Sequence, residues 1–251
     1  MDLAQMTILF LAAAVAGAIN SVAGGGSFIS FPALLLAGVS PVIANATNAT
    51  ALWPGSVASV GAYRRELAVQ RKGILLFSAI SLIGGLLGAL LLLRTSEALF
   101  ERLIPYLLLL ATIVFAASPR ITRLARRYGG EGGPLGRLAV LAVYLLVAVY
   151  GGFFGAGLGI LTLAVLGLLG LENIHEMNAL KTLQASLVNG IAVAAFVLAG
   201  IVDWPIAVLM TAGAITGGYG GAAIARRLNP AHVRLGVIAL SFALTAYFFV
   251  A

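Results

Sequence analysis

The chain contains no cysteine, and charged side chains make up only 9% of its 251 residues. Without cysteine it has no disulfides, thiolate metal sites, iron–sulfur clusters or cysteine nucleophiles. With few charges and 61% hydrophobic residues, it cannot surround a soluble core with a wetted surface. The low charge and high hydrophobicity predict a membrane protein, surrounded by lipid.

Motifs for catalysis and energy coupling are also missing. The apolar segments contain no paired carboxylates, no zinc-ligand cluster and no Ser/His pair, which argues against a membrane enzyme or an assembly factor. There is no Walker loop for ATP, so we expect no enzyme activity and no cofactor. The net charge of +7 would suit nucleic acid in a soluble protein, but here we expect it to mark membrane topology instead.

Long apolar runs are present in place of charge. Residues 73–93, 138–155 and 233–250 each approach the roughly 20 residues that a helix needs to cross a bilayer. They lack the two-residue alternation of a membrane barrel, the other structure that satisfies every backbone amide in lipid. The segment 6–18 follows Asp2, where a signal peptide would carry basic residues, so we expect a retained span. The predicted fold class is an all-α polytopic membrane protein.

Basic residues predict how the chain crosses the membrane. Twelve of the fifteen Lys and Arg fall within residues 64–72, 120–137 and 226–234, which the positive-inside rule places on the cytoplasmic side of a bacterial inner membrane. The glycine-rich core of the second stretch predicts a flexible linker. We therefore expect a first transmembrane repeat over 1–118, a cytoplasmic linker over 119–137 and a second repeat over 138–251, together one membrane domain.

A constant shift of 133 positions pairs the two halves without a gap. The pairs include Gly24 with Gly157, Gly26 with Gly159, and Asn45 with Asn178. The same shift places a cytoplasmic stretch of one half on an outer turn of the other, so the repeats are expected to be inverted. Inversion requires an odd number of crossings per repeat. We expect about eight long transmembrane helices plus two short helices after glycine breaks, at 27–36 and 160–169.

The two glycine breaks are where we expect the substrate. Irregular backbone at membrane depth is tolerated where protein or a water-filled cavity covers it, so the breaks are expected to meet near the centre. A helix that begins after Gly26 or Gly159 offers unpaired N–H groups and the positive end of its dipole to an anion. The alternative is close helix packing. We prefer packing for Gly84, Gly85, Gly88 and their partners Gly217, Gly218 and Gly221.

Polar side chains inside apolar segments are costly in lipid and tend to face partners or a substrate path. The predicted substrate-binding residues are Asn20, Ser21, Gly24, Gly25, Gly26, Ser27, Asn45, Asn48, Gly157, Gly159, Asn178, Lys181, Thr182 and Gln184. Asn178 and Lys181 stand three apart and share one helix face. Lys181 would neutralise a bound anion; the alternative is that it snorkels to the interface beside Glu172 or Glu176.

These motifs resemble the TauE/SafE group of bacterial permeases, also described as sulfite exporters. The matching stretches are residues 20–27, 31–34 and 44–48 in the first half, and 152–159 and 178–182 in the second. The resemblance covers nearly the whole chain. It implies movement of small sulfur-containing or organic anions, such as sulfite, sulfoacetate or related sulfonates, across the cytoplasmic membrane. Val165 stands where the shift would place a partner for Pro32, so that proline has no counterpart.

We therefore expect a secondary transporter that moves a small anion through the lipid bilayer by alternating access. Export is favoured, because an inside-negative potential assists anion efflux by about 2.3 kcal/mol per charge per 100 mV. The rival is a proton-coupled permease or channel for a neutral or cationic solute, disfavoured because no acid lies inside a span. Coupling through His175 and assembly as a homodimer both stay open.

Overall fold

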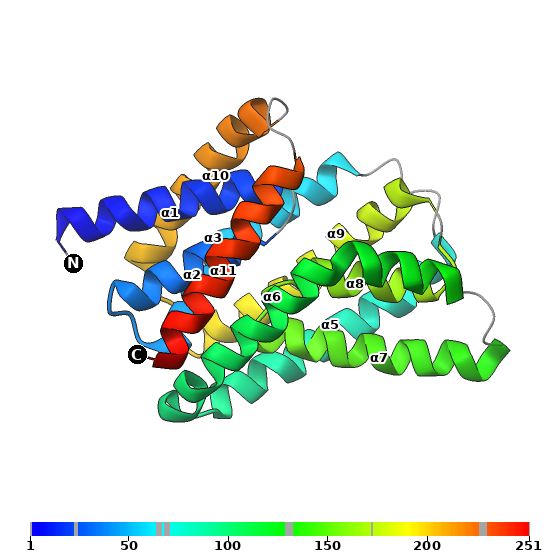
Figure 1. Cartoon of the computed structure of the whole chain (residues 1–251). Helices are drawn as coiled ribbons and strands as arrows, with labels where there is room; N and C mark the ends of the chain where they lie inside the picture. Colours follow the sequence, from blue (N-terminus) through cyan, green and yellow to red (C-terminus); the bar gives the residue numbers. More distant parts are fainter. Residues whose placement is uncertain are drawn as a thin grey trace. The chain divides into compact units, whose positions relative to one another are not determined.

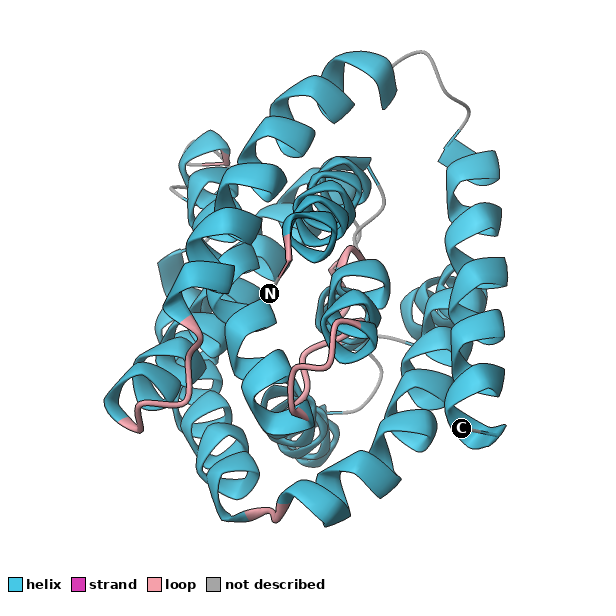
Figure 2. Cartoon of the chain, turned by 90° about the vertical axis from the view of Figure 1, so that its left-hand side faces the viewer, coloured by secondary structure: helices cyan, strands magenta, loops and turns pink. Residues whose placement is uncertain are grey.

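The computed structural model describes residues 2–22, 25–63, 67, 71–128, 133–171, 173–225 and 230–250, which form helices joined by short loops and contain no strand (Figures 1 and 2). The helices are α1 (Leu3–Val22), α2 (Ser27–Leu36), α3 (Pro41–Ala62), α5 (Arg71–Arg94), α6 (Glu97–Tyr128), α7 (Gly133–Phe153), α8 (Leu158–Leu168), α9 (Ile174–Leu198), α10 (Trp204–Ala225) and α11 (Pro230–Val250). The all-α prediction is confirmed for this part of the chain.

Helix length separates two classes within the described residues. Eight helices have between 20 and 32 residues, and a helix of 20 residues is about 30 Å long, the thickness of a hydrocarbon core. The other two, α2 and α8, have 10 and 11 residues. Four segments are long and apolar enough to cross a membrane by length and composition: Leu3–Asn20, Ile74–Arg94, Glu97–Ile121 and Glu176–Leu198.

The two short helices end at glycines in the left-handed region. Gly38 has φ +83° and follows α2, and Gly170 has φ +80° and follows α8. At the end of α2 the N–H groups of Gly38 and Val39 donate to the Leu35 and Leu34 carbonyls. At the end of α8 those of Gly170 and Leu171 donate to the Gly167 and Leu166 carbonyls. This is the Schellman arrangement, which satisfies helix carbonyls and stops the helix where glycine tolerates the required φ.

The segment predicted as a flexible linker is helical over most of its length. Helix α6 continues through Pro119 to Tyr128, and α7 begins at Gly133, while residues 129–132 lie outside the described part. Arginine is a good helix former, and a helix keeps its backbone hydrogen bonds internal on entering water. The arginines before Tyr128 therefore extend α6, while most of the glycine-rich core that predicted the linker lies outside the described residues. The proposed repeat boundaries themselves stay a prediction.

The helices group into two compact units that each draw on both halves of the sequence. Unit 1 contains residues 1–55, 92–113 and 196–251, and unit 2 contains residues 56–91 and 114–195. Helices α3, α5, α6 and α9 contribute residues to both.

In unit 1, glycines allow α1 and α10 to pack backbone against backbone (Figure 1). A Cβ added at Gly217 would lie 1.8 Å from the Ala14 carbonyl oxygen, and one added at Gly17 would lie 2.1 Å from the Ala214 carbonyl oxygen. Side chains at these positions would push the helices apart. Small residues at helix contacts are the usual means of association in membranes, where no hydrophobic effect drives helices together.

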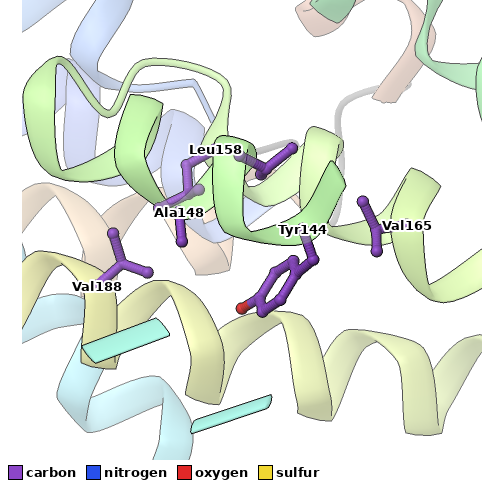
Figure 3. Close-up of a cluster of buried hydrophobic side chains, with 6 residues drawn as sticks. Tyr144, Ala148, Leu158, Val165 and Val188 are labelled. Atoms are coloured by element: carbon purple, nitrogen blue, oxygen red, sulfur yellow. The ribbon is translucent and has the colours of Figure 1, made fainter. Parts of the chain in front are cut away.

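In unit 2, α5 and α7 pack in the same manner. A Cβ at Gly88 would lie 2.1 Å from the Val149 carbonyl oxygen, and one at Gly152 would lie 2.1 Å from the Gly85 carbonyl oxygen. The packing role expected for Gly84, Gly85, Gly88 and Gly217 is thus confirmed, whereas Gly218 makes only an ordinary contact, at 3.8 Å. Beside this contact lies a buried apolar cluster (Figure 3): Tyr144, Val147, Ala148, Leu158, Val165 and Val188.

Candidate functional site

The second glycine break is a sharp turn between α7 and α8 in unit 2. Helix α7 ends at Phe153, and Gly155 and Gly157 adopt φ of +81° and +75° before α8 begins at Leu158. Residues with a Cβ rarely adopt this conformation, which costs them roughly 1–2 kcal/mol. The prediction of irregular backbone at this point of the chain is therefore confirmed.

A tyrosine of α7 fixes the orientation of the turn. The Tyr150 hydroxyl donates a hydrogen bond of 2.7 Å to the Ala156 carbonyl. That carbonyl belongs to a planar trans peptide, in which the C=O and N–H point in opposite directions. By holding the Ala156 carbonyl, Tyr150 turns the N–H group of Gly157 the other way.

The amino end of α8 has no side-chain cap. Its cap residue is Gly157, whose carbonyl accepts hydrogen bonds from the N–H groups of Ile160 and Leu161. Among the described residues, the N–H groups of Gly157 and Gly159 donate to no protein acceptor. Free N–H groups and the positive end of the helix dipole make such an end attractive to an anion.

Lys181 of α9 brings a cation to this end of α8. A Cβ placed on Gly159 would lie 3.4, 3.7 and 3.9 Å from Cδ, Cγ and Cε of Lys181. The lysine stem therefore crosses the first turn of α8, with its ammonium group at the far end of that stem. Lys181 forms no ion pair with another described residue, and Glu176 accepts a hydrogen bond from Asn173. The predicted partner Glu172 lies outside the described residues.

Other predicted residues of α9 extend the polar face. Asn178 stands one turn before Lys181 and is half-buried, as is Thr182. Gln184 is fully buried, and its Oε1 accepts a hydrogen bond of 2.8 Å from the Ser81 hydroxyl of α5. The Ser81 hydroxyl is also hydrogen bonded to that of Tyr144 in α7.

The first glycine break, in unit 1, is arranged differently. Gly25 has φ +94°, and the N–H of Gly26 donates a hydrogen bond of 2.8 Å to Asn20 Oδ1. A Cβ on Gly26 would lie 2.4 Å from the Ala16 carbonyl oxygen, so α1 presses directly on this turn. Asn20 thus accepts the hydrogen bond of the Gly26 N–H, a group that we had expected to donate to the substrate.

The remaining predicted residues of unit 1 lie around this break and on α3. Ser27 is the first residue of α2 and is half-buried. The backbone of Ser21 lies in the last turn of α1. Asn45 and Asn48 are buried in α3, and Asn48 Oδ1 has no hydrogen-bond partner within the described residues. Gly24 lies outside the described part of the chain.

The structure thus brings together Gly157, Gly159 and Lys181 in unit 2, and Asn20 with Gly26 in unit 1. A single site that uses both breaks stays a prediction. Sequence reasoning missed Tyr150, Ser81 and Tyr144. Their signal was weak but present, because each is a polar group inside a long apolar run, where polar groups need a partner.

Comparison with known proteins identifies the family. The family model described as Sulfite exporter TauE/SafE matches residues 9–248. A probable membrane transporter protein of Haemophilus influenzae is 32% identical over 245 residues, which cover 96% of this chain and 93% of that protein. The probable membrane transporter protein YfcA of Escherichia coli K12 is 28% identical over 239 residues, with 95% and 87% covered.

A probable membrane transporter protein ORF9 of a Sinorhizobium species is 29% identical over 243 residues, with 95% of this chain and 90% of that protein covered. No solved structure gave a significant match. The resemblance seen in the glycine and asparagine motifs is confirmed along nearly the whole chain. The chain belongs to the Sulfite exporter TauE/SafE family of membrane transporters.

Proposed function

We propose that this protein is a secondary transporter that moves a small anion, such as sulfite, sulfoacetate or a related organic anion, across the bacterial inner membrane. The observation that carries the proposal is the position of Lys181, whose stem crosses Gly159 at the uncapped amino end of α8. The family description, sulfite exporter, supports the same chemistry.

The chemical logic is that the polar groups left unpaired at this turn, among the described residues, are donors. The ammonium group of Lys181 and the N–H groups of Gly157 and Gly159 all suit an oxygen that carries negative charge. A hydrogen bond to a charged group contributes about 1.5–3 kcal/mol, and a helix end contributes roughly 0.3–1 kcal/mol, up to about 2 when partly buried. Removing an ion from water costs several kcal/mol, so binding needs both contributions.

We infer transport by alternating access between two inverted repeats, in which the eight long helices cross the membrane. One pair of helix starts supports this reading, because Pro41 and Ile174 are 133 positions apart. The short helices α2 and α8 follow glycine breaks in both halves. Such repeats with broken helices are typical of secondary transporters. An inside-negative potential would drive an anion outward, so we propose export.

The test is anion flux into and out of proteoliposomes at both voltage polarities, with sulfite, sulfoacetate, acetate and chloride compared. We expect saturable flux of a sulfur oxyanion in the wild type. Lys181→Gln should reduce that flux at least tenfold, and Lys181→Arg should retain part of it.

The matched control is Arg123→Gln, which removes one positive charge from an exposed position of α6 and should leave flux unchanged. Normal flux in Lys181→Gln would move the anion site elsewhere. Flux of a neutral or cationic solute in place of any anion would contradict the proposal as a whole.

A further inference from the structure

A second donor group lies one turn beyond Lys181 and is unused within the described residues. Gln184 has 0% exposure, and its Nε2 has no hydrogen-bond partner in the described part of unit 2. Leaving a buried N–H without an acceptor is costly, and native proteins seldom do so without a reason. Residues three apart on a helix share a face, so this donor belongs to the same side of α9 as the Lys181 ammonium group.

Two further side chains hold the oxygen end of the Gln184 amide in this structure. The Ser81 hydroxyl donates its only hydrogen to Gln184 Oε1, at 2.8 Å. The hydrogen bond between Ser81 and Tyr144 must therefore be donated by the tyrosine hydroxyl. The chain of donation runs from Tyr144 of α7 through Ser81 of α5 to Gln184 of α9. It holds Oε1 in place and leaves both hydrogens of Nε2 without an acceptor.

The surroundings of this network are apolar. Tyr144 lies among Ala148, Leu158 and Val188 (Figure 3), and the Phe77 ring packs on it with ring centroids 5.0 Å apart. Hydrogen bonds are electrostatically stronger in such a setting than in water, and an unpaired polar group is more costly there. The network therefore holds the Gln184 amide in one orientation. Its unpaired Nε2 hydrogens carry a free-energy cost until an acceptor binds to them.

We propose that Ser81 and Tyr144 are positioning residues that present the Gln184 amide as a donor to the transported anion. This inference rests on the proposed function and narrows its substrate class. With Lys181, the two glycine N–H groups and Gln184 Nε2 all donating, the site selects anions whose oxygens carry no proton, such as sulfite or a sulfonate. An anion with a hydroxyl donor would leave that hydroxyl without an acceptor and should bind roughly tenfold more weakly.

The test is the concentration dependence of sulfite flux in proteoliposomes, with KM and maximal rate measured separately. Ser81→Ala should raise KM about five- to tenfold with little change in maximal rate, because the amide is free to rotate. Ser81→Thr, which keeps the hydroxyl, should return KM to within about twofold of the wild type. Thr112→Val removes another fully buried hydroxyl, bonded only within its own helix in the described structure, and should leave KM unchanged.

A double-mutant cycle separates positioning from general damage. Gln184→Leu alone should raise KM at least as much as Ser81→Ala, and adding Ser81→Ala to it should raise KM no further. Wild-type KM in Ser81→Ala, additive effects in the pair, or equal losses in Ser81→Ala and Thr112→Val would overturn the inference. If Lys181→Gln abolishes flux while these variants keep the wild-type KM, the proposed function stands and this inference fails.

The substrate class is tested with a matched pair, ethanesulfonate and 2-hydroxyethanesulfonate, which differ by one hydroxyl. The wild type should prefer ethanesulfonate by about tenfold in KM, and Gln184→Leu should reduce that preference. Equal KM values for the two in the wild type would contradict selection by donors. If the wild type transports neither sulfite nor a sulfonate, both the proposed function and this inference are contradicted.

Discussion

The stem of Lys181 in α9 lies across Gly159 in the first turn of α8, within 4 Å of the place where a side chain on that glycine would begin. The two residues are 22 positions apart in the sequence, and the glycine leaves room for the lysine to pass. A cation is thereby brought to a helix end whose own N–H groups already favour negative charge.

Gly159→Ala is expected to fold and to impair transport. The nearest atom to the new methyl group is Cδ of the flexible lysine stem, at 3.4 Å, which can yield by a small amount. The displaced ammonium group should raise the KM for sulfite a few-fold, while the melting temperature in detergent stays near that of the wild type. A wild-type KM would show that the lysine does not act at this turn.

Gly26→Ala should behave in the opposite way at the equivalent position of the first break. Its Cβ would lie 2.4 Å from the backbone oxygen of Ala16, and backbone cannot yield without moving α1. Overpacking of this kind costs about 1–3 kcal/mol, so we expect a lower melting temperature and lower yield. Gly236→Ala in α11, with nothing within 4 Å, is the control and should be neutral. Equal stability of both variants would contradict the close contact.

Tyr150→Phe should loosen the turn before α8 without unfolding the protein. It removes one hydrogen bond to the Ala156 carbonyl, worth about 0.5–1.5 kcal/mol, and lets the following peptide rotate. Sulfite flux at low concentration should fall several-fold. Tyr106→Phe changes an exposed tyrosine of α6 and should have no effect. Identical behaviour of the two variants would show that the tether is dispensable.

Two adjacent glycines of α10 offer a sharp test of the helix packing. Gly217→Ala would place a Cβ 1.8 Å from the Ala14 carbonyl oxygen, whereas Gly218→Ala meets only the Gly17 oxygen, at 3.8 Å. We expect Gly217→Ala to lose folded protein in size-exclusion chromatography and Gly218→Ala to resemble the wild type. Tolerance of both would mean that α1 and α10 do not approach so closely in the membrane.

The absence of cysteine makes membrane topology directly measurable by labelling single introduced cysteines in intact cells. Ala199→Cys lies in the exposed turn between α9 and α10, which we expect to face outward. Arg123→Cys lies on the arginine-rich part of α6, which we expect to face the cytoplasm. An impermeant maleimide should label the first and not the second. Labelling of both, or of the second alone, would contradict the inverted arrangement.

Much of the helical architecture follows from the sequence, because hydrocarbon leaves few alternatives to helices and because glycine marks their ends. The short helices after Gly26 and near Gly159 were predicted within a few residues. The extension of α6 to Tyr128 was not predicted, since the glycine-rich core that follows it suits a flexible linker. Helix propensity and water-facing charge favoured the helix there.

The site was predictable in kind but not in contacts. Polar residues in apolar runs made Lys181 and Gln184 candidates, yet nothing local indicates that Gln184 meets Ser81, 103 positions away. Asn20 makes a contact that the sequence did not indicate either, because its Oδ1 accepts a hydrogen bond from the Gly26 N–H that was expected to face substrate. Which polar groups satisfy one another depends on helix packing, and packing depends on close glycine contacts spread over the whole chain.

The most direct measurement is an experimental structure of the purified protein with selenite, the selenium analogue of sulfite, located by its anomalous scattering. We expect one strong peak at the amino end of α8, with anion oxygens about 2.7–2.9 Å from Lys181 Nζ and within hydrogen-bond distance of the Gly159 N–H. A selenite peak away from Gly159 and Lys181, in protein that transports sulfite, would contradict it.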